Sequence, residues 1–266
     1  MTNPISDVKN PMDVTGLNVI VTGGCSGIGW GITLAFAQRG ANVAILDCDV
    51  QSGEKAVTEL TQYGGKYVYI ACNIADSQST LQAAGAARSA LGPIDVLVNC
   101  AGITAVKPFL DMDKELSEFR KVIDVDLIGT ANMTYAVGNI MRNDKRGGLI
   151  INISSSSAVR CSGSRELPMT GYVASKAAVN HLTTSWAIEF AEHNIRVNCI
   201  MPGPTKSKMD DNLTPEYLER IANSILTRRQ GHGMEIGALC VFFASPEGSH
   251  LDGVVMPHDG GFNCIN

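Results

Sequence analysis

The stretch that decides the fold runs Thr22-Gly23-Gly24-Cys25-Ser26-Gly27-Ile28-Gly29, directly after the apolar run Leu17–Val21. Glycines let the backbone turn sharply, and a helix that starts just after such a turn directs unpaired N–H groups and its positive dipole end at a bound anion. The order of strand, glycine turn and helix therefore predicts a diphosphate site. The spacing differs from GxGxxG, and a glycine turn by itself can also serve only as a tight connection.

An acidic residue lies where the second predicted strand ends. Asp47 follows the run Asn42–Leu46, about 20 residues beyond the glycines. A carboxylate there can accept hydrogen bonds from a ribose 2′-hydroxyl, and its charge repels the 2′-phosphate of NADP. No Arg or Lys at positions 25, 48 or 49 offsets that repulsion. We therefore expect NAD as the cofactor, unless Asp47 only begins a turn.

Short apolar runs alternate with helical patterns along the whole chain. The predicted strands are Leu17–Val21, Asn42–Leu46, Lys66–Cys72, Ile94–Val98, Leu149–Ile153, Arg196–Ile200 and Val254–Met256. The predicted helices run from the glycine turn to about Arg39 and over Val50–Tyr63, Ser77–Ala90, Glu118–Met141, Gly171–His193 and Met234–Ala244. This alternation predicts an α/β fold, a Rossmann-like doubly wound parallel sheet of about seven strands with helices on both faces.

Composition narrows the class of protein. The 266 residues are 45% apolar and 18% charged, and no linker or repeat divides them, so we predict one domain over 1–266 with a polar N-terminal extension at 1–15. A net charge of −5 without basic clusters disfavours nucleic acid and anionic membranes as partners. No signal peptide and no apolar run of about 18 residues is visible. The eight cysteines form no CxxC pair, so we predict no metal site and a cytoplasmic location.

A candidate acid/base pair lies in the second half of the chain. Tyr172 and Lys176 are four residues apart on a predicted helix, and therefore share one face of it. A tyrosine hydroxyl is a poor base at neutral pH, but a neighbouring ammonium favours the phenolate. Serines at 154–157 follow a predicted strand, where a hydroxyl could donate to a substrate carbonyl. In isolation, the YxxxK spacing also occurs as an ordinary exposed pair.

Together these motifs resemble those of the short-chain dehydrogenase/reductase family in its single-domain form, from about Leu17 to Gly261. The ordered motifs are Thr22-Gly23-xxx-Gly27-x-Gly29, Asn99-Cys100-Ala101-Gly102, Ser155, Tyr172-xxx-Lys176, Asn198 with Pro202-Gly203, and Asp259-Gly260-Gly261. The resemblance implies an NAD(H)-dependent oxidoreductase that interconverts a small-molecule secondary alcohol and its ketone.

The resemblance also implies residue roles. Tyr172 would protonate the carbonyl oxygen in reduction and deprotonate the alcohol in oxidation, beside Ser155 as the catalytic serine. Lys176 would hold the nicotinamide ribose and favour ionisation of Tyr172. The remaining cofactor contacts would be Gly23, Cys25, Ser26, Gly27, Ile28 and Gly29 at the diphosphate, Asp47, Asn73, Ile74, Asn99, Ala101 and Gly102 at the adenosine, and Pro202, Gly203 and Thr205 at the nicotinamide.

Several positions depart from the family pattern. Asp126 stands where the family usually has an Asn that supports a water relay to the lysine, partly through its backbone carbonyl. We expect Asp126 to keep the backbone role and activity to survive. Asn73 replaces a common Asp, and Cys100 replaces the second Asn of the usual turn. Ser155 and Tyr172 are 17 residues apart, so the extra residues around 164–170 are expected to form a loop at the substrate mouth.

The substrate is less constrained by the sequence. The segment 203–233 is the expected lid, in which Met209, Leu213, Tyr217, Leu218 and Ile221 either face a substrate or pack a short helix. The charges of Arg160, Arg165 and Glu166 are interpreted as solvated, with binding of a polar substrate as the alternative. A polyol or other small secondary alcohol is favoured, closely followed by a hydroxysteroid.

The predicted helices 118–141 and 171–193 resemble those at the family's subunit interface, which implies a homotetramer. Two alternative functions stay open. One is an NADPH-preferring carbonyl or 3-oxoacyl reductase. The other is a catalytically silent NAD-binding scaffold, for which only Asp126 speaks.

Overall fold

The computed structural model describes residues 12–160, 168–207 and 214–264. Several predictions therefore fall partly outside the described residues. These are the N-terminal extension up to residue 11, most of the expected loop at 164–170 with Arg165 and Glu166, and the part of the expected lid that holds Met209 and Leu213.

Seven strands form one sheet, in the order β3-β2-β1-β4-β5-β6-β7, and every neighbouring pair is parallel. They are β1 (Asn18–Thr22), β2 (Asn42–Asp47), β3 (Tyr67–Ala71), β4 (Val96–Asn99), β5 (Gly148–Ile153), β6 (Ile195–Pro202) and β7 (Val255–His258). The chain proceeds outward from β1 to β3 and then returns to the other side of β1 at β4. At such a switch point the connections leave in opposite directions and open a crevice at the carboxyl ends of the strands.

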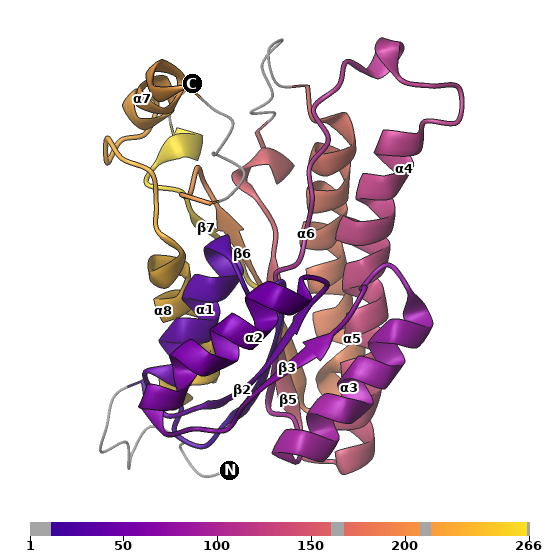
Figure 1. Ribbon diagram of the computed structural model, residues 1–266, viewed down its shortest axis with the longest axis vertical. Helices are drawn as coiled ribbons and strands as arrows, with labels where there is room; N and C mark the ends of the chain where they lie inside the picture. The colour runs from indigo at the N-terminus through magenta and orange to yellow at the C-terminus, as the bar shows by residue number, and fades with distance from the viewer. Residues whose placement is uncertain (1–11, 161–167, 208–213, 265–266) are drawn as a thin grey trace.

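Helices cover both faces of the sheet (Figure 1). On one face lie α1 (Gly27–Ala37), α2 (Val50–Leu60) and α8 (Gly233–Ala244). On the other lie α3 (Ser77–Leu91), α4 (Ser117–Ile123), α5 (Thr130–Asp144) and α6 (Thr170–Phe190). A further helix, α7 (Pro215–Asn223), stands above α8 near the carboxyl edge of the sheet. The predicted doubly wound fold is confirmed.

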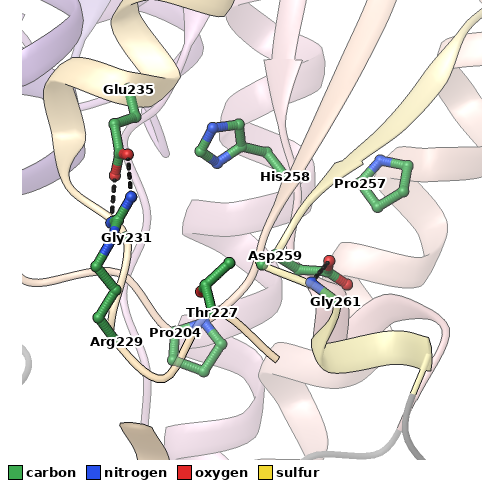
Figure 2. A pocket seen from close by; sticks show the side chains of 10 residues that line it. Pro204, Thr227, Arg229, Gly231, Glu235, Pro257, His258, Asp259 and Gly261 are labelled. Atoms are coloured by element: carbon green, nitrogen blue, oxygen red, sulfur yellow. Dashed lines mark hydrogen bonds and ion pairs between the residues drawn. The ribbon is translucent and has the colours of Figure 1, made fainter. Parts of the chain in front are cut away.

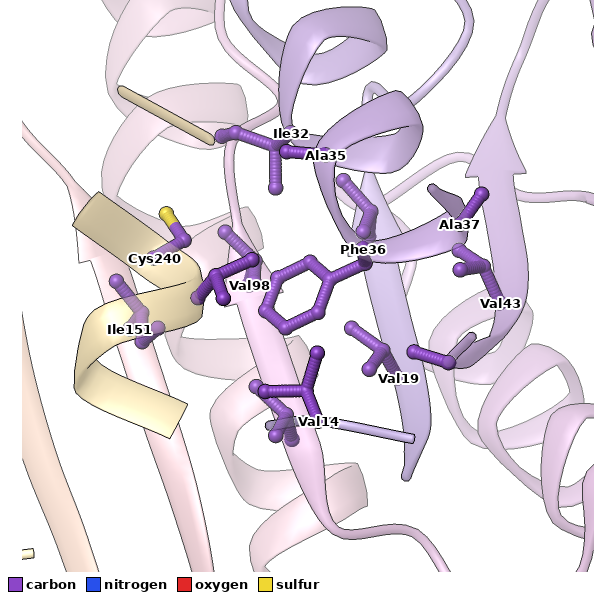
Figure 3. Close-up of a cluster of buried hydrophobic side chains, with 14 of the residues drawn as sticks. Val14, Val19, Ile32, Ala35, Phe36, Ala37, Val43, Val98, Ile151 and Cys240 are labelled. Carbon is purple, nitrogen blue, oxygen red and sulfur yellow. The ribbon is translucent and has the colours of Figure 1, made fainter. Parts of the chain in front are cut away.

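The strands are mainly apolar because their side chains point alternately into two cores. Val19 and Val21 of β1 enter the core beneath α1 and α8, where Phe36 is fully buried (Figure 3). Ile20, between them, enters the opposite core with Met133 of α5. Burial of each such side chain contributes roughly 1.5–3 kcal/mol. The two cores fix the direction in which each strand delivers its carboxyl end to the crevice.

The contact between α1 and α8 depends on glycine. A Cβ on Gly31 would collide with the backbone of Gly233, and one on Gly237 would lie 2.6 Å from the Cβ of Ala35. These missing side chains let the two helix backbones touch. The close contact holds the start of α1, which follows the glycine turn, against the start of α8.

The predicted helix Glu118–Met141 differs most from the structure. α4 ends at Ile123, a π-helical turn covers Asp124–Gly129, and α5 continues to Asp144. A π turn inserts an extra residue without breaking the apolar pattern, which is why the sequence predicts one uniform helix. Within the described parts of the chain, no helix combines the length and apolar character needed to cross a bilayer.

Candidate active site

The glycine turn lies at the carboxyl end of β1, and its glycines leave no room for side chains. Gly23 has a φ of +64°, and a Cβ there would lie 2.8 Å from the Cα of Ala101. A Cβ on Gly29 would collide with the carbonyl oxygen of Gly23. Only glycine fits, so the turn is held against the neighbouring turn that follows β4.

The start of α1 is open to an anion. Ser26 is the N-cap residue, yet its side chain makes no capping hydrogen bond. The N–H of Trp30 donates to the carbonyl of Ser26, so the earlier N–H groups of α1, at Gly27 to Gly29, have no partner within the helix. Ser207 lies opposite, since a Cβ on Gly27 would be 3.4 Å from that of Ser207. This arrangement fits a diphosphate between the two segments.

The carboxylate of Asp47 is oriented by two backbone N–H groups. Oδ2 accepts from the N–H of Cys25 at 3.3 Å, and Oδ1 accepts from the N–H of Asp49 at 3.1 Å. The Tyr69 hydroxyl donates to the backbone carbonyl of Asp47 at 2.9 Å. The carboxylate is thus fixed beside the glycine turn, where a ribose would lie.

Thr22 joins the two turns, although no sequence motif assigned it this role. Its Oγ1 accepts hydrogen bonds from the N–H groups of Cys100 and Ala101, at 3.0 and 3.1 Å. A threonine just before a glycine turn, at the end of a central strand, is the signal from which it could have been found. Thr22 therefore sets the distance between the glycine turn and Gly102.

The side chain of Asn99 faces the interior. Its Nδ2 donates to Thr134 Oγ1 at 3.0 Å and to Asn152 Oδ1 at 2.9 Å, and Asn152 in turn donates to Thr183 Oγ1 at 2.9 Å. This buried network ties β4 and β5 to α5 and α6. Asn99 therefore shapes the turn from behind, and only the backbone of the turn is left to face a ribose.

The expected adenine turn follows β3. The Oδ1 of Asn73 accepts from the N–H of Ala75 at 3.2 Å, which closes a local turn and leaves one lone pair on that oxygen. Ile74 is buried, and its carbonyl accepts from Asn132 Nδ2 at 3.0 Å. The turn is therefore anchored to α5, beside the π turn.

Two serines at the end of β5 have different surroundings. The Oγ of Ser154 donates to the backbone carbonyl of Lys176 at 2.9 Å, which ties β5 to α6. The Oγ of Ser155 accepts from the N–H of Ser157 at 3.1 Å, and Ser155 is 7% exposed. Because Ser155 uses its oxygen as an acceptor, its O–H remains able to donate to a substrate.

Tyr172 and Lys176 lie one turn apart on α6, as their spacing predicts. Lys176 Nζ is 5.5 Å from the centroid of the Tyr172 ring. Tyr172 is half-buried, whereas Lys176 is 5% exposed and its Nζ donates to the carbonyl of Ile153 at 3.3 Å. A buried ammonium beside a phenol favours the phenolate.

Asp126 pairs with this lysine through its side chain. Its Oδ2 lies 3.4 Å from Lys176 Nζ, while its backbone carbonyl accepts from Thr130 Oγ1 at 2.8 Å. Burial by itself would lower the pKa of Lys176, but the attraction of Asp126, with that of Tyr172 and Cys100, outweighs it and raises the pKa. Burial raises the pKa of Asp126, and Lys176 opposes that effect. The sequence did not predict this side-chain contact between Asp126 and Lys176.

Gly102 allows the turn after β4 to lie close to Lys176 and Asp126. A Cβ on Gly102 would lie 3.2 Å from Lys176 Nζ and 3.3 Å from Asp126 Oδ2. Without that atom, a ribose could approach the ammonium from the turn. Lys176 and Asp126 thus lie beside the turn that follows β4, at the switch point of the sheet.

The segment after β6 completes the crevice. A Cβ on Gly203 would lie 2.7 Å from the Cα of Asp259, and Thr205 Oγ1 donates to the carbonyl of Gly203 at 2.9 Å. A cavity of about 380 Å³ opens beside Pro204 (Figure 2). It is lined by Pro204, Thr227, Arg229, Gly231, Glu235, Pro257, His258, Asp259, Gly260 and Gly261. Ser155, Tyr172, Lys176 and Asp126 are not among its lining residues, whereas Asp259, which packs against Gly203, is one of them.

Comparison with known proteins shows the class of enzymes to which this chain is similar. The family model described as Enoyl-(Acyl carrier protein) reductase matches residues 23–263. Oxidoreductase UcpA from Salmonella typhimurium is 36% identical over 256 residues, which cover 93% of this chain and 95% of the relative.

Two solved structures are similar to this protein over nearly the whole chain. A short-chain type dehydrogenase/reductase from Mycobacterium marinum has a TM-score of 0.90 at 31% identity, covering 96% of this chain and 98% of that one. A 7α-hydroxysteroid dehydrogenase complexed with NADH and 7-oxo glycochenodeoxycholic acid has a TM-score of 0.87 at 32% identity, covering 94% and 95%. The protein is an oxidoreductase of a class that uses a nicotinamide cofactor. It belongs to the short-chain dehydrogenase/reductase family.

Proposed function

We propose that the protein interconverts a secondary alcohol and a ketone with NAD(H), and that Tyr172 is the general acid/base. The observation that carries this proposal is the shared face of Tyr172 and Lys176, which lies beside Gly102 and is tied to the end of β5 by the bond from Ser154, the neighbour of Ser155. Tyr172 would exchange a proton with the substrate oxygen, and the Ser155 hydroxyl would donate to the same oxygen. The bound nicotinamide would supply or accept the hydride. The presence of all three side chains argues against a silent scaffold.

The preference for NAD rests on Asp47. Its carboxylate is fixed by two backbone N–H groups at the end of β2, where a 2′-phosphate would meet an oriented negative charge. A ribose 2′-hydroxyl could instead donate to it. The proposal is therefore NAD, with Gly23 and Cys25 to Gly29 at the diphosphate and Pro202, Gly203 and Thr205 at the nicotinamide.

A hydroxysteroid-like alcohol is favoured over a polyol. Segments that follow β4, β5 and β6 carry exposed apolar side chains: Val106 (48% exposed), Phe109 (44%), Leu110 (94%), Val159 (62%) and Leu226 (59%). Such side chains suit an extended apolar substrate better than a small polar one. The proposed lid at 203–233 contributes α7, on which Tyr217, Leu218 and Ile221 are half-buried.

We also propose a homotetramer, on the basis of α5 and α6. Tyr135 and Ile188 on these helices are 66% and 82% exposed. Tyr135 lines a groove of about 450 Å³ between these helices together with Trp186 and Phe190. Exposed apolar residues on paired helices are typical of a subunit interface. A cytoplasmic location is proposed because the described cysteines are all free, Cys48 and Cys264 being exposed.

The direct test is a spectrophotometric screen of secondary alcohols with NAD at alkaline pH, with polyols and hydroxysteroids in the same panel. NADH and NADPH are titrated in parallel. Turnover of a hydroxysteroid, with tighter binding of NADH, is the expected result. Tighter binding of NADPH would contradict the role of Asp47, and turnover only of polyols would contradict the substrate class.

A further inference from the structure

The carboxylate of Asp126 is placed where it can act on the charge of the catalytic lysine. Asp126 is fully buried on the π turn between α4 and α5, and Lys176 is 5% exposed. Oδ1 accepts from the N–H of Ile103 at 2.8 Å. Oδ2 is buried, accepts no hydrogen bond from the described residues, and lies 3.4 Å from Lys176 Nζ. One oxygen is therefore anchored to the backbone, and the other faces the ammonium.

The surroundings of this ion pair add little other charge. Among the residues that the structure describes, the titratable groups that face Lys176 from the elements packed around it are Asp126 on the π turn, Tyr172 on α6, Cys100 after β4 and Cys199 on β6. Burial raises the pKa of both cysteine thiols to about 12, so both are neutral at physiological pH. Asp126 is then the principal anion opposing the ammonium, at a buried site where charges interact strongly.

An ammonium promotes ionisation of a nearby phenol through its net positive field. A buried carboxylate 3.4 Å away cancels much of that field. An uncharged amide at position 126 could keep the bond from the Ile103 N–H without cancelling the field.

We propose that Asp126 is a positioning residue that holds Lys176 in a buried ion pair and thereby weakens the field that this ammonium exerts on the Tyr172 phenol. This inference rests on the proposed function for Tyr172. The ion pair would then favour ketone reduction over alcohol oxidation at neutral pH, because reduction needs the protonated phenol and oxidation needs the phenolate.

The test is Asp126→Asn, which preserves size and the acceptor for Ile103. Ionisation of the Tyr172 phenol is measured in the apoprotein by the ultraviolet absorbance of tyrosinate as the pH is raised. For the parent protein and for Asp126→Asn, the titration curve of the same protein carrying Tyr172→Phe is subtracted, which leaves the signal of Tyr172. We expect the midpoint to fall by about one pH unit or more in Asp126→Asn. The acidic limb of the pH profile of kcat/KM for alcohol oxidation should shift in the same direction.

Asp124→Asn is the matched control, because Asp124 is exposed on the same π turn and loses the same charge. It should move neither midpoint. Asp126→Ser is the second variant if Asp126→Asn does not fold, and it should shift in the same direction. An unchanged or raised midpoint in a folded Asp126 variant would overturn the inference. If the protein turns over no substrate, the proposed function is wrong. The titration of the apoprotein needs no substrate, so it still decides whether Asp126 acts on Tyr172 through Lys176.

Discussion

Asp47 has both carboxylate oxygens oriented by backbone N–H groups, so its charge cannot easily turn away from an incoming ligand. Asp47→Asn removes the charge and keeps an acceptor oxygen. We expect binding of NADPH to tighten by about tenfold or more, because a 2′-phosphate would no longer face an anion at short range. Fluorescence titration with NADH and NADPH measures the change.

Asp76→Asn is the control for this substitution. Asp76 caps α3 through the N–H groups of Gln78 and Ser79, and Asn caps equally well, so only the charge is lost. Its cofactor preference should equal that of the parent protein. If Asp47→Asn leaves the ratio of the two affinities unchanged, Asp47 does not select the cofactor.

At the scale of residues, the placement of Tyr172 and Lys176 on one helix could be predicted from the sequence, but several side-chain contacts of the candidate site residues could not. Tyr172 and Lys176 share a face because helical periodicity is local. The ion pair of Asp126 with Lys176 joins residues 50 positions apart, and the inward side chain of Asn99 depends on Thr134 and Asn152. Such contacts arise from tertiary packing, which motif spacing does not encode.

The crossing of α1 and α8 provides a prediction at the scale of elements. Gly31→Ala places a Cβ into the backbone of Gly233, so we expect a loss of stability on the order of 3 kcal/mol or failure to fold. Gly85→Ala, at an exposed position of α3 with nothing near the added Cβ, should instead raise the free energy of unfolding by about 0.5 to 1 kcal/mol. Urea unfolding measures both. Equal effects of the two substitutions would contradict the close crossing.

The start of α8 provides a pH-dependent prediction. Glu235 pairs with Arg229 at 2.6 Å and accepts from the N–H of His232, and the side-chain bond from Arg229 is the main reason that the pKa of Glu235 falls to about 2. Because the pKa of Glu235 in the folded protein lies below the ordinary glutamate value of 4.5, this stabilisation is present above about pH 4.5 and is lost as the pH falls toward 2.

Glu235→Gln should therefore lower the free energy of unfolding by about 1 kcal/mol at neutral pH, a small loss because water screens this partly exposed pair. The loss should become progressively smaller below pH 4.5. Denaturant unfolding at a series of pH values measures this. Glu59→Gln, in an exposed pair with Lys55, should have little effect at any pH. A penalty for Glu235→Gln that is constant with pH would contradict the assigned cause.

Most elements could be predicted because the strands are short, mainly apolar runs and the helices between them end in polar or glycine segments. The end of α2 at Leu60 and the extension of β6 to Pro202 differ from the predicted bounds by two or three residues. The π turn at Asp124–Gly129 could not be predicted, because it leaves the apolar periodicity almost unchanged.

At the scale of the whole molecule, the parallel sheet of seven strands follows from the alternation of strands and helices, whereas assembly does not follow from one chain. The proposed homotetramer would bury Ile188 on α6, which is 82% exposed in the protomer. Ile188→Asp should therefore reduce the molar mass measured by light scattering. Leu81→Asp, at an exposed position on α3, should leave it unchanged. A monomeric parent protein would contradict the proposal.

The central claim is that the Tyr172 phenol is the acid/base, and Tyr172→Phe tests it most directly. With the best substrate of the screen, we expect kcat to fall by about 100-fold or more while NADH binding is retained. Tyr135→Phe, at an exposed position on α5, should leave kcat unchanged. Turnover by Tyr172→Phe at the rate of the parent protein would contradict the account.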